Sequence, residues 1–121
     1  MKIHFIRHGQ PDYSMVNPED NIETPNSSPL TTKGQEQASA VNVELIKNAE
    51  IMLVSPYKRT LETAKIINKK LNKKLIIEEN LHEWTPDKTK TSKAKEFNKF
   101  NLMYLKGELN LCNCENDEER N

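Results

Sequence analysis

The sequence predicts an α/β fold of three layers, α/β/α, with a central and mostly parallel sheet. Short apolar runs of strand length alternate along the chain with longer stretches whose apolar residues recur at helical spacing. Strands that alternate with helices in this way form parallel βαβ units, with the helices packed on the sheet. Ligands of such folds bind beyond the carboxyl ends of the strands, and polar motifs follow two of the predicted strands.

The first predicted strand is the run Ile3–Phe5, which leads into Arg7-His8-Gly9, where a glycine permits a sharp turn. A long loop rich in proline, asparagine and serine follows and continues to Pro29. Loops of this length in compact domains are usually functional or disordered. Because this loop comes directly after the motif, we expect it to be functional.

The middle of the chain predicts a helix, a strand and a second helix. The first helix runs from about Thr32 to Asn48 behind an N-capping threonine, and the strand is the apolar run Ile51–Val54. The second helix starts at Ser55-Pro56. Its apolar face consists of Leu61, Ala64, Ile67 and Leu71.

A third short strand is predicted at Leu75–Ile77, and a loop then leads to a helix over about Ser92 to Leu105. The apolar stripe of this helix is Ala94, Phe97 and Phe100. Residues 1–105 are therefore predicted to form one domain, and residues 106–121 a polar tail or the start of a further part.

Composition restricts the partners of the chain. Lys plus Arg and Asp plus Glu both total 18, so no net charge favours binding to nucleic acid or to an acidic membrane. The N-terminus lacks the pattern of a signal peptide, and no run approaches a membrane span. Cys112 and Cys114 indicate neither a disulfide framework nor a metal site with four ligands. We expect a cytoplasmic protein without nucleic-acid or membrane partners, and the sequence does not indicate its oligomeric state.

Five motifs stand in a fixed order along the first part of the chain. They are Arg7-His8-Gly9, Ser28-Pro29-Leu30-Thr31, Gly34 with Gln37-Ala38, the stretch from Ser55 to Ala64 (SPYKRTLETA), and Leu81-His82-Glu83-Trp84. In this order they resemble the histidine phosphatase superfamily, the phosphoglycerate-mutase-like enzymes. The resemblance implies a phosphoglycerate-mutase-like fold and a phosphoryl-transfer reaction on a phosphorylated small molecule.

The residues themselves agree with this chemistry. An imidazole at a strand end beside a guanidinium suits a nucleophile that attacks phosphorus, so His8 is the candidate nucleophile. Arg7 and Arg59 are the candidate phosphate ligands, because a planar guanidinium donates two parallel hydrogen bonds to oxygen. Two of the three arginines of the chain lie in these motifs, whereas the other basic residues are mostly lysines.

The resemblance implies two further site residues. Glu83 occupies the place of the acid that protonates the leaving oxygen and then activates water, although it could instead be a solvated loop residue. Ser14 lies where the phosphate loop of the family carries a polar ligand, and Gln10 or Asp12 are alternatives. We expect no metal or organic cofactor, because the arginines would neutralise the charge on phosphate.

One departure from the family concerns a second histidine, which the family carries near its C-terminus. The chain contains only His4, His8 and His82. The simplest explanation of this departure is a truncated enzyme. We therefore predict a phosphomonoester hydrolase that acts through a phosphohistidine on His8. The alternatives are a phosphotransferase of the phosphoglycerate mutase type and a noncatalytic phosphate-binding or truncated family member.

Overall fold

The computed structural model describes residues 1–83, 85, 88–99 and 102. It divides into two units, of which the first combines Met1–Tyr13 with Ser27–Leu81. The second unit combines Ser14–Asn26 with the chain from His82 onward. The domain predicted over residues 1–105 thus contains parts of both units, and the predicted tail over 106–121 lies outside the described residues.

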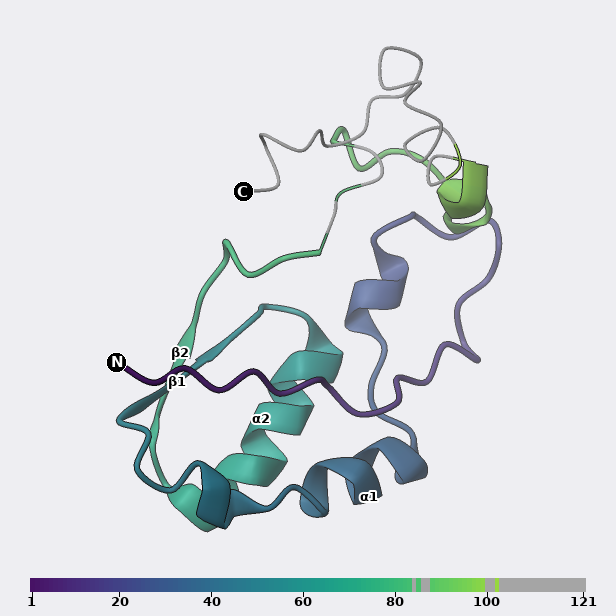
Figure 1. The fold of residues 1–121 in the computed structure, drawn as a ribbon. Helices are drawn as coiled ribbons and strands as arrows, with labels where there is room; N and C mark the ends of the chain where they lie inside the picture. Colours follow the sequence, from purple (N-terminus) through teal and green to yellow (C-terminus); the bar gives the residue numbers. More distant parts are fainter. Residues whose placement is uncertain (84, 86–87, 100–101, 103–121) are drawn as a thin grey trace. The chain divides into compact units, whose positions relative to one another are not determined.

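The sheet of the first unit consists of two parallel strands, β1 (Ile51–Val54) and β2 (Lys74–Ile77), both of which the sequence predicts (Figure 1). The α/β fold class is therefore confirmed. Val54 is buried, and helix α2 packs on β1, so the buried residue marks the covered face of the sheet. Ile51 and Leu53 alternate with it and remain 47% and 54% exposed.

Helix α2 (Lys58–Leu71) joins the two strands and carries much of the buried surface of the unit. It starts three residues later than predicted, because Ser55 Oγ donates a hydrogen bond to Thr60 Oγ1 at 2.6 Å and holds a turn ahead of the helix. Ala64 and Ile67 of the predicted apolar face are buried. The helix ends at Asn72, which adopts the left-handed conformation with φ 54°, a conformation that asparagine tolerates.

Helix α1 (Thr32–Ser39) is shorter than the predicted helix over residues 32–48. Its start is as expected, because Thr31 Oγ1 accepts a hydrogen bond from the Gly34 amide at 2.9 Å. Its end was predicted too late. The Asn42 side chain accepts a hydrogen bond from the Glu44 amide and caps a separate 3-10 helix, η2 (Val43–Leu45), which interrupts the α-helix.

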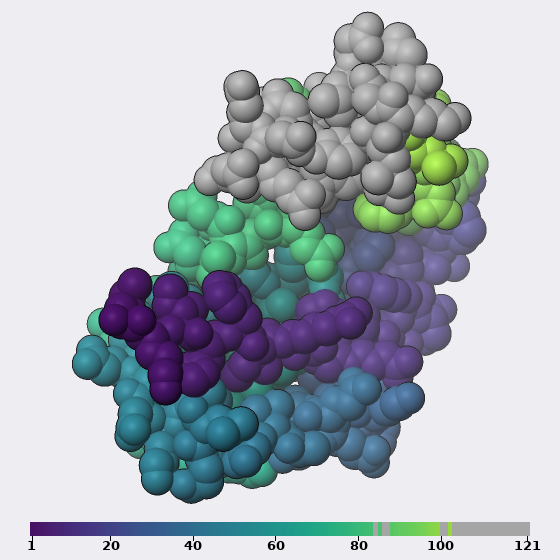
Figure 2. Space-filling model, viewed as in Figure 1, coloured from purple at the N-terminus to yellow at the C-terminus, as the bar shows by residue number. Residues whose placement is uncertain are grey.

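The predicted strand at Ile3–Phe5 is wrong as a sheet element. Within the described residues the sheet contains β1 and β2 alone, and residues 1–7 form neither a helix nor a strand. Ile3 and Phe5 are 60% and 93% exposed, and Figure 2 shows the N-terminal segment uncovered on the face in view. A short strand-like run of residues is not enough to form a strand, because a strand also requires a neighbouring edge with which to pair.

The second unit joins the loop that follows the Arg-His-Gly motif to the segment after residue 88. The Ile22 amide donates to the Ser92 carbonyl at 2.7 Å, and the Ala94 amide donates to the Asp20 carbonyl at 2.7 Å. The predicted helix from about Ser92 begins as a 3-10 helix, η3 (Ala94–Glu96), and continues as α-helix over residues 97–99. Its predicted remainder, including Phe100, lies largely outside the described residues.

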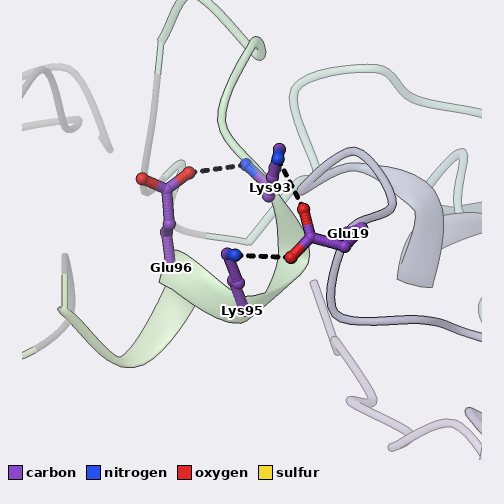
Figure 3. A network of polar contacts seen from close by, with 4 residues as sticks. All are labelled: Glu19, Lys93, Lys95 and Glu96. Carbon is purple, nitrogen blue, oxygen red and sulfur yellow. Dashed lines mark hydrogen bonds and ion pairs between the residues drawn. The ribbon is translucent and has the colours of Figure 1, made fainter.

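Charged side chains reinforce this junction between loop and helix. The Glu19 carboxylate accepts hydrogen bonds from the ammonium groups of Lys93 and Lys95, one to each oxygen (Figure 3). Glu96 accepts a hydrogen bond from the Lys93 amide at 2.7 Å. The hydrogen bonds from Lys93 and then Lys95 lower the pKa of Glu19 from 4.5 to about 2. The loop after the motif is thus tied to η3 by an exposed ionic contact.

The ionic contact of Glu19 with Lys93 and Lys95 predicts that the stability of this loop depends on pH. Because the folded pKa of Glu19 is depressed, its stabilising contribution is present above about pH 4.5 and is lost as the pH falls towards 2. We expect the Glu19→Gln variant to show faster amide exchange at Ile22 than wild type above that window, and equal exchange near its lower end. The Glu36→Gln variant on α1 is the control, and a Glu19 carboxyl that titrates in NMR at an ordinary midpoint would contradict the prediction.

No helix within the described part of the chain combines the length and the apolar character that crossing a membrane requires.

Candidate active site

The segment from His8 to Asp12 is attached to α1 and to the residues just before it by hydrogen bonds at several backbone atoms. The Gln10 amide donates to Gln37 Oε1 at 2.9 Å, and the Thr31 amide donates to the Gln10 carbonyl at 3.0 Å. The Asp12 amide then donates to the Pro29 carbonyl at 2.7 Å. These contacts fix the backbone of the segment that the sequence identifies as the phosphate loop.

Two glycines allow this close approach. A Cβ on Gly9 would lie 2.3 Å from the carbonyl oxygen of Gly34, and a Cβ on Gly34 would lie 2.3 Å from that of Gln10. Both distances are far below any real contact of a Cβ atom, so neither position accepts a side chain without movement of the backbone. The glycines of two separate motifs therefore serve one packing contact beside His8.

The other side of Gly9 contacts helix α2. Its amide donates to Thr63 Oγ1 at 3.0 Å, and the Thr63 hydroxyl donates to the Arg59 carbonyl at 2.7 Å. Gly9, Arg59 and Thr63 are all buried. The structure thus brings the Arg-His-Gly motif together with the first turns of the helix that carries Arg59.

The ring of His8 is half-buried, and its Nδ1 lies 2.7 Å from the carbonyl oxygen of Gly9. A carbonyl oxygen can only accept a hydrogen bond, so this contact requires the proton on Nδ1. In the neutral ring Nε2 then carries a free lone pair. The local backbone therefore selects the tautomer that a nucleophilic histidine needs at Nε2.

An open hollow of about 420 Å³ adjoins this histidine. Its wall comes from the motif segment on one side and from α1 and the residues after it on the other. The lining residues are Arg7, His8, Gly9, Gln10, Pro11, Gln37, Ala38 and Val41. Arg7 and His8, which the sequence predicts as phosphate ligand and nucleophile, thus share one hollow.

Arg59, the second predicted phosphate ligand, is buried. It does not line the hollow, and it is 3% exposed. Its guanidinium carbon lies 4.5 Å from the centre of the Tyr57 ring, within the range of a cation–π contact. The structure places its helix beside Gly9, while its function as a phosphate ligand stays a prediction.

Ser14 and Glu83 both belong to the second unit, and both are exposed. The Glu83 carbonyl accepts a hydrogen bond from His82 Nδ1 at 2.8 Å. The functions of Ser14 and Glu83 at the site stay predictions from the family resemblance. Trp84, which stands beside the predicted acid, lies outside the described residues.

Sequence reasoning missed the functions of Gln37 and Thr63. Both lie inside motifs that the sequence analysis identifies, and both hold the backbone next to His8. Their presence in an ordered set of motifs was the one sequence signal that they could be functional. Their hydrogen bonds to the backbone beside His8 depend on how closely α1 and α2 approach this segment.

Comparisons with known proteins show the family and the fold to which the chain is similar. The family model of the histidine phosphatase superfamily (branch 1) matches residues 3–105. A 2,3-bisphosphoglycerate-dependent phosphoglycerate mutase of Thermoplasma acidophilum is 36% identical over 98 residues, which are 77% of this chain and 46% of that protein. The chain therefore spans less than half the length of this relative.

Two solved structures show the same fold at low sequence identity. A candidate alpha-ribazole-5'-P phosphatase from Escherichia coli aligns with a TM-score of 0.59 and 18% identity, over 95% of this chain and 59% of that one. A mycobacterial glucosyl-3-phosphoglycerate phosphatase aligns with a TM-score of 0.52 and 18% identity, over 76% of this chain and 42% of that one. With the match of the family model over most of its length, the chain belongs to the histidine phosphatase superfamily.

Proposed function

We propose that this chain hydrolyses phosphomonoesters through a phosphohistidine formed on Nε2 of His8. The observation that carries the proposal is the 2.7 Å contact between His8 Nδ1 and the Gly9 carbonyl, which leaves the Nε2 lone pair available beside an open hollow. Covalent transfer to an imidazole replaces one difficult displacement by two easier ones.

In the first step Nε2 attacks phosphorus and the bond from phosphorus to the ester oxygen breaks. The electron pair of that bond leaves with the oxygen, which takes a proton from Glu83 in its acid form. The Nδ1–H bond to the Gly9 carbonyl supports the positive charge that the ring acquires. The products are the free alcohol and phosphorylated His8.

In the second step the ionised Glu83 removes a proton from water as the water oxygen attacks phosphorus. The bond from phosphorus to Nε2 breaks, its electrons return to the ring, and inorganic phosphate leaves. Glu83 ends the cycle protonated, as it began. An open hollow and a half-buried His8 favour this step, because water can reach the phosphohistidine.

Charge neutralisation is assigned to Arg7, with Arg59 and Ser14 as further ligands of the phosphoryl oxygens. A guanidinium directed at the developing charge stabilises the transition state without the help of a metal ion. Arg7 lines the hollow beside His8, which supports its assignment. The assignments of Arg59 and Ser14 rest on their positions in the motifs.

The substrate class is a phosphorylated small molecule. Two of the relatives are named for phosphoglycerate substrates or their glucosyl derivative, so phosphoglycerates are the first compounds to test. The relative that is 36% identical is named as a mutase, which makes phosphoglycerate interconversion the second candidate function. A mutase returns the phosphoryl group to a bound sugar acid, whereas a phosphatase releases inorganic phosphate.

The test follows phosphate release from an aryl phosphate and from phosphoglycerates by purified chain in the presence of a chelator. We expect release by wild type, and an acid-labile, alkali-stable phosphoenzyme that the His8→Ala variant does not form. His4→Ala, on the same exposed segment, is the matched control and should behave as wild type. Release that persists in His8→Ala would disprove the mechanism, and isomerisation without release would favour the mutase.

A noncatalytic phosphate-binding protein is a third candidate, because Arg7 lines the hollow beside His8 and could bind phosphate there without turnover. It predicts a rise of the melting temperature with inorganic phosphate and no turnover of any ester. Phosphate-dependent stabilisation that Arg7→Ala abolishes, in a chain that hydrolyses nothing, would establish it.

A further inference from the structure

Thr63 stands at a junction between the nucleophile segment and helix α2. The residue is 5% exposed, and its hydroxyl oxygen takes part in two hydrogen bonds. The hydroxyl has one proton, which it donates to the Arg59 carbonyl one turn earlier at 2.7 Å. Its lone pairs are therefore free to accept the Gly9 amide proton at 3.0 Å.

This second hydrogen bond holds the amide of Gly9. A glycine has no Cβ and can adopt backbone conformations on both sides of φ zero. The amide on the N-terminal side of Gly9 is held by Thr63, and the next amide, that of Gln10, is held by Gln37. The two contacts fix the peptide groups that flank Gly9.

The carbonyl of Gly9 is the acceptor for His8 Nδ1. Its direction depends on the peptide group that joins Gly9 to Gln10, and thus on the contacts that hold Gly9 in place. A loss of the contact at the Gly9 amide would free the backbone on one side of this acceptor. The hydroxyl of Thr63 is thereby connected to the imidazole of His8 through a single residue.

We infer that Thr63 is a positioning residue, which selects the Nδ1–H tautomer of His8 by holding the Gly9 backbone through its buried hydroxyl. This function rests on the proposed reaction at Nε2, because only a nucleophilic His8 requires that tautomer. Thr63 does not line the hollow beside His8, so in this proposal it acts through the Gly9 backbone. The same hydroxyl ties the orientation of His8 to the first turns of α2, where Arg59 lies.

The test compares three variants by NMR of the His8 ring nitrogens, which report the tautomer in the full chain without any turnover. Thr63→Val keeps the shape of the side chain and removes the hydroxyl, so we expect the Nε2–H form to appear. Thr63→Ser keeps the hydroxyl and should retain the wild-type tautomer. Thr60→Val is the matched control, because Thr60 also bonds a backbone carbonyl from α2 but does not contact Gly9.

Activity provides a second measurement if the wild-type chain turns over. Displacement of the nucleophile by about 1 Å can lower a rate about a hundredfold, so kcat of Thr63→Val should fall by about that factor while KM changes little. Thr63→Ser should recover most of kcat. A wild-type chain without turnover would reject the proposed reaction, whereas the tautomer of His8 would still decide the function of Thr63.

Hydrogen exchange of the wild-type chain tests the inference without any variant, so the test does not require Thr63→Val to fold. If Thr63 holds Gly9, the Gly9 amide exchanges as slowly as the buried amides of α2. Exchange of Gly9 at the rate of an exposed amide would overturn the inference, even if Thr63→Val does not fold. An unchanged Nδ1–H tautomer in folded Thr63→Val would overturn it as well.

Discussion

Replacement of Gly34 by alanine is expected to destabilise the chain by about 2 kcal/mol or more, because overpacking against a fixed backbone typically costs 1–3 kcal/mol. The usual effect has the opposite sign, since alanine inside a helix is more stable than glycine by about 0.5–1 kcal/mol. At this position the new Cβ would lie 2.3 Å from the Gln10 carbonyl oxygen and 2.8 Å from the Gln10 amide nitrogen. Either α1 or the nucleophile segment must move.

Urea unfolding followed by circular dichroism measures this effect. Gln35→Ala is the control, since it changes an exposed neighbour on the same helix and should alter the free energy of unfolding little. We also expect Gly34→Ala to lose activity per folded molecule, because its clash lies two residues from His8. A variant as stable as wild type would contradict this close approach of α1 to Gln10.

Both strands and the buried part of α2 could be predicted from the sequence, because apolar runs and helical spacing report burial directly. The segment at Ile3–Phe5 could not. A short strand-like run predicts a strand, whereas pairing depends on which edge of another strand is available, and no local pattern records that. The early end of α1 was also missed. The Asn42 side chain caps the separate helix η2, and this single contact competes with continuation of α1.

In the candidate site, too, the sequence indicates which residue types are present but not which tertiary contacts they make. His8 and Arg7 could be identified from the sequence, and the structure places both on one hollow. The functions of Gln37 and Thr63 became visible only through hydrogen bonds to the backbone of the nucleophile segment. No periodicity predicts such contacts, because they depend on how α1 and α2 pack.

Substitution of Arg59 by lysine is expected to lower kcat/KM about a hundredfold, if its guanidinium binds the phosphoryl group as the family motif implies. Lysine keeps the charge but loses the planar pair of donors and the stacking on Tyr57. Lys58→Ala is the matched control, because Lys58 is an exposed cation at the adjacent position of the same helix. Kinetics with an aryl phosphate and thermal unfolding are measured on the same samples.

The two measurements separate two functions for this buried arginine. An arginine that is 3% exposed and whose guanidinium lies over an aromatic ring can stabilise α2 by packing alone. In that case Arg59→Lys lowers the melting temperature, while the folded fraction keeps its kcat/KM. If the guanidinium instead binds phosphate, the variant loses kcat/KM at a nearly unchanged melting temperature, and inorganic phosphate no longer stabilises it. The second outcome would assign the phosphate site to the junction of Gly9 with α2, as the contact through Thr63 favours.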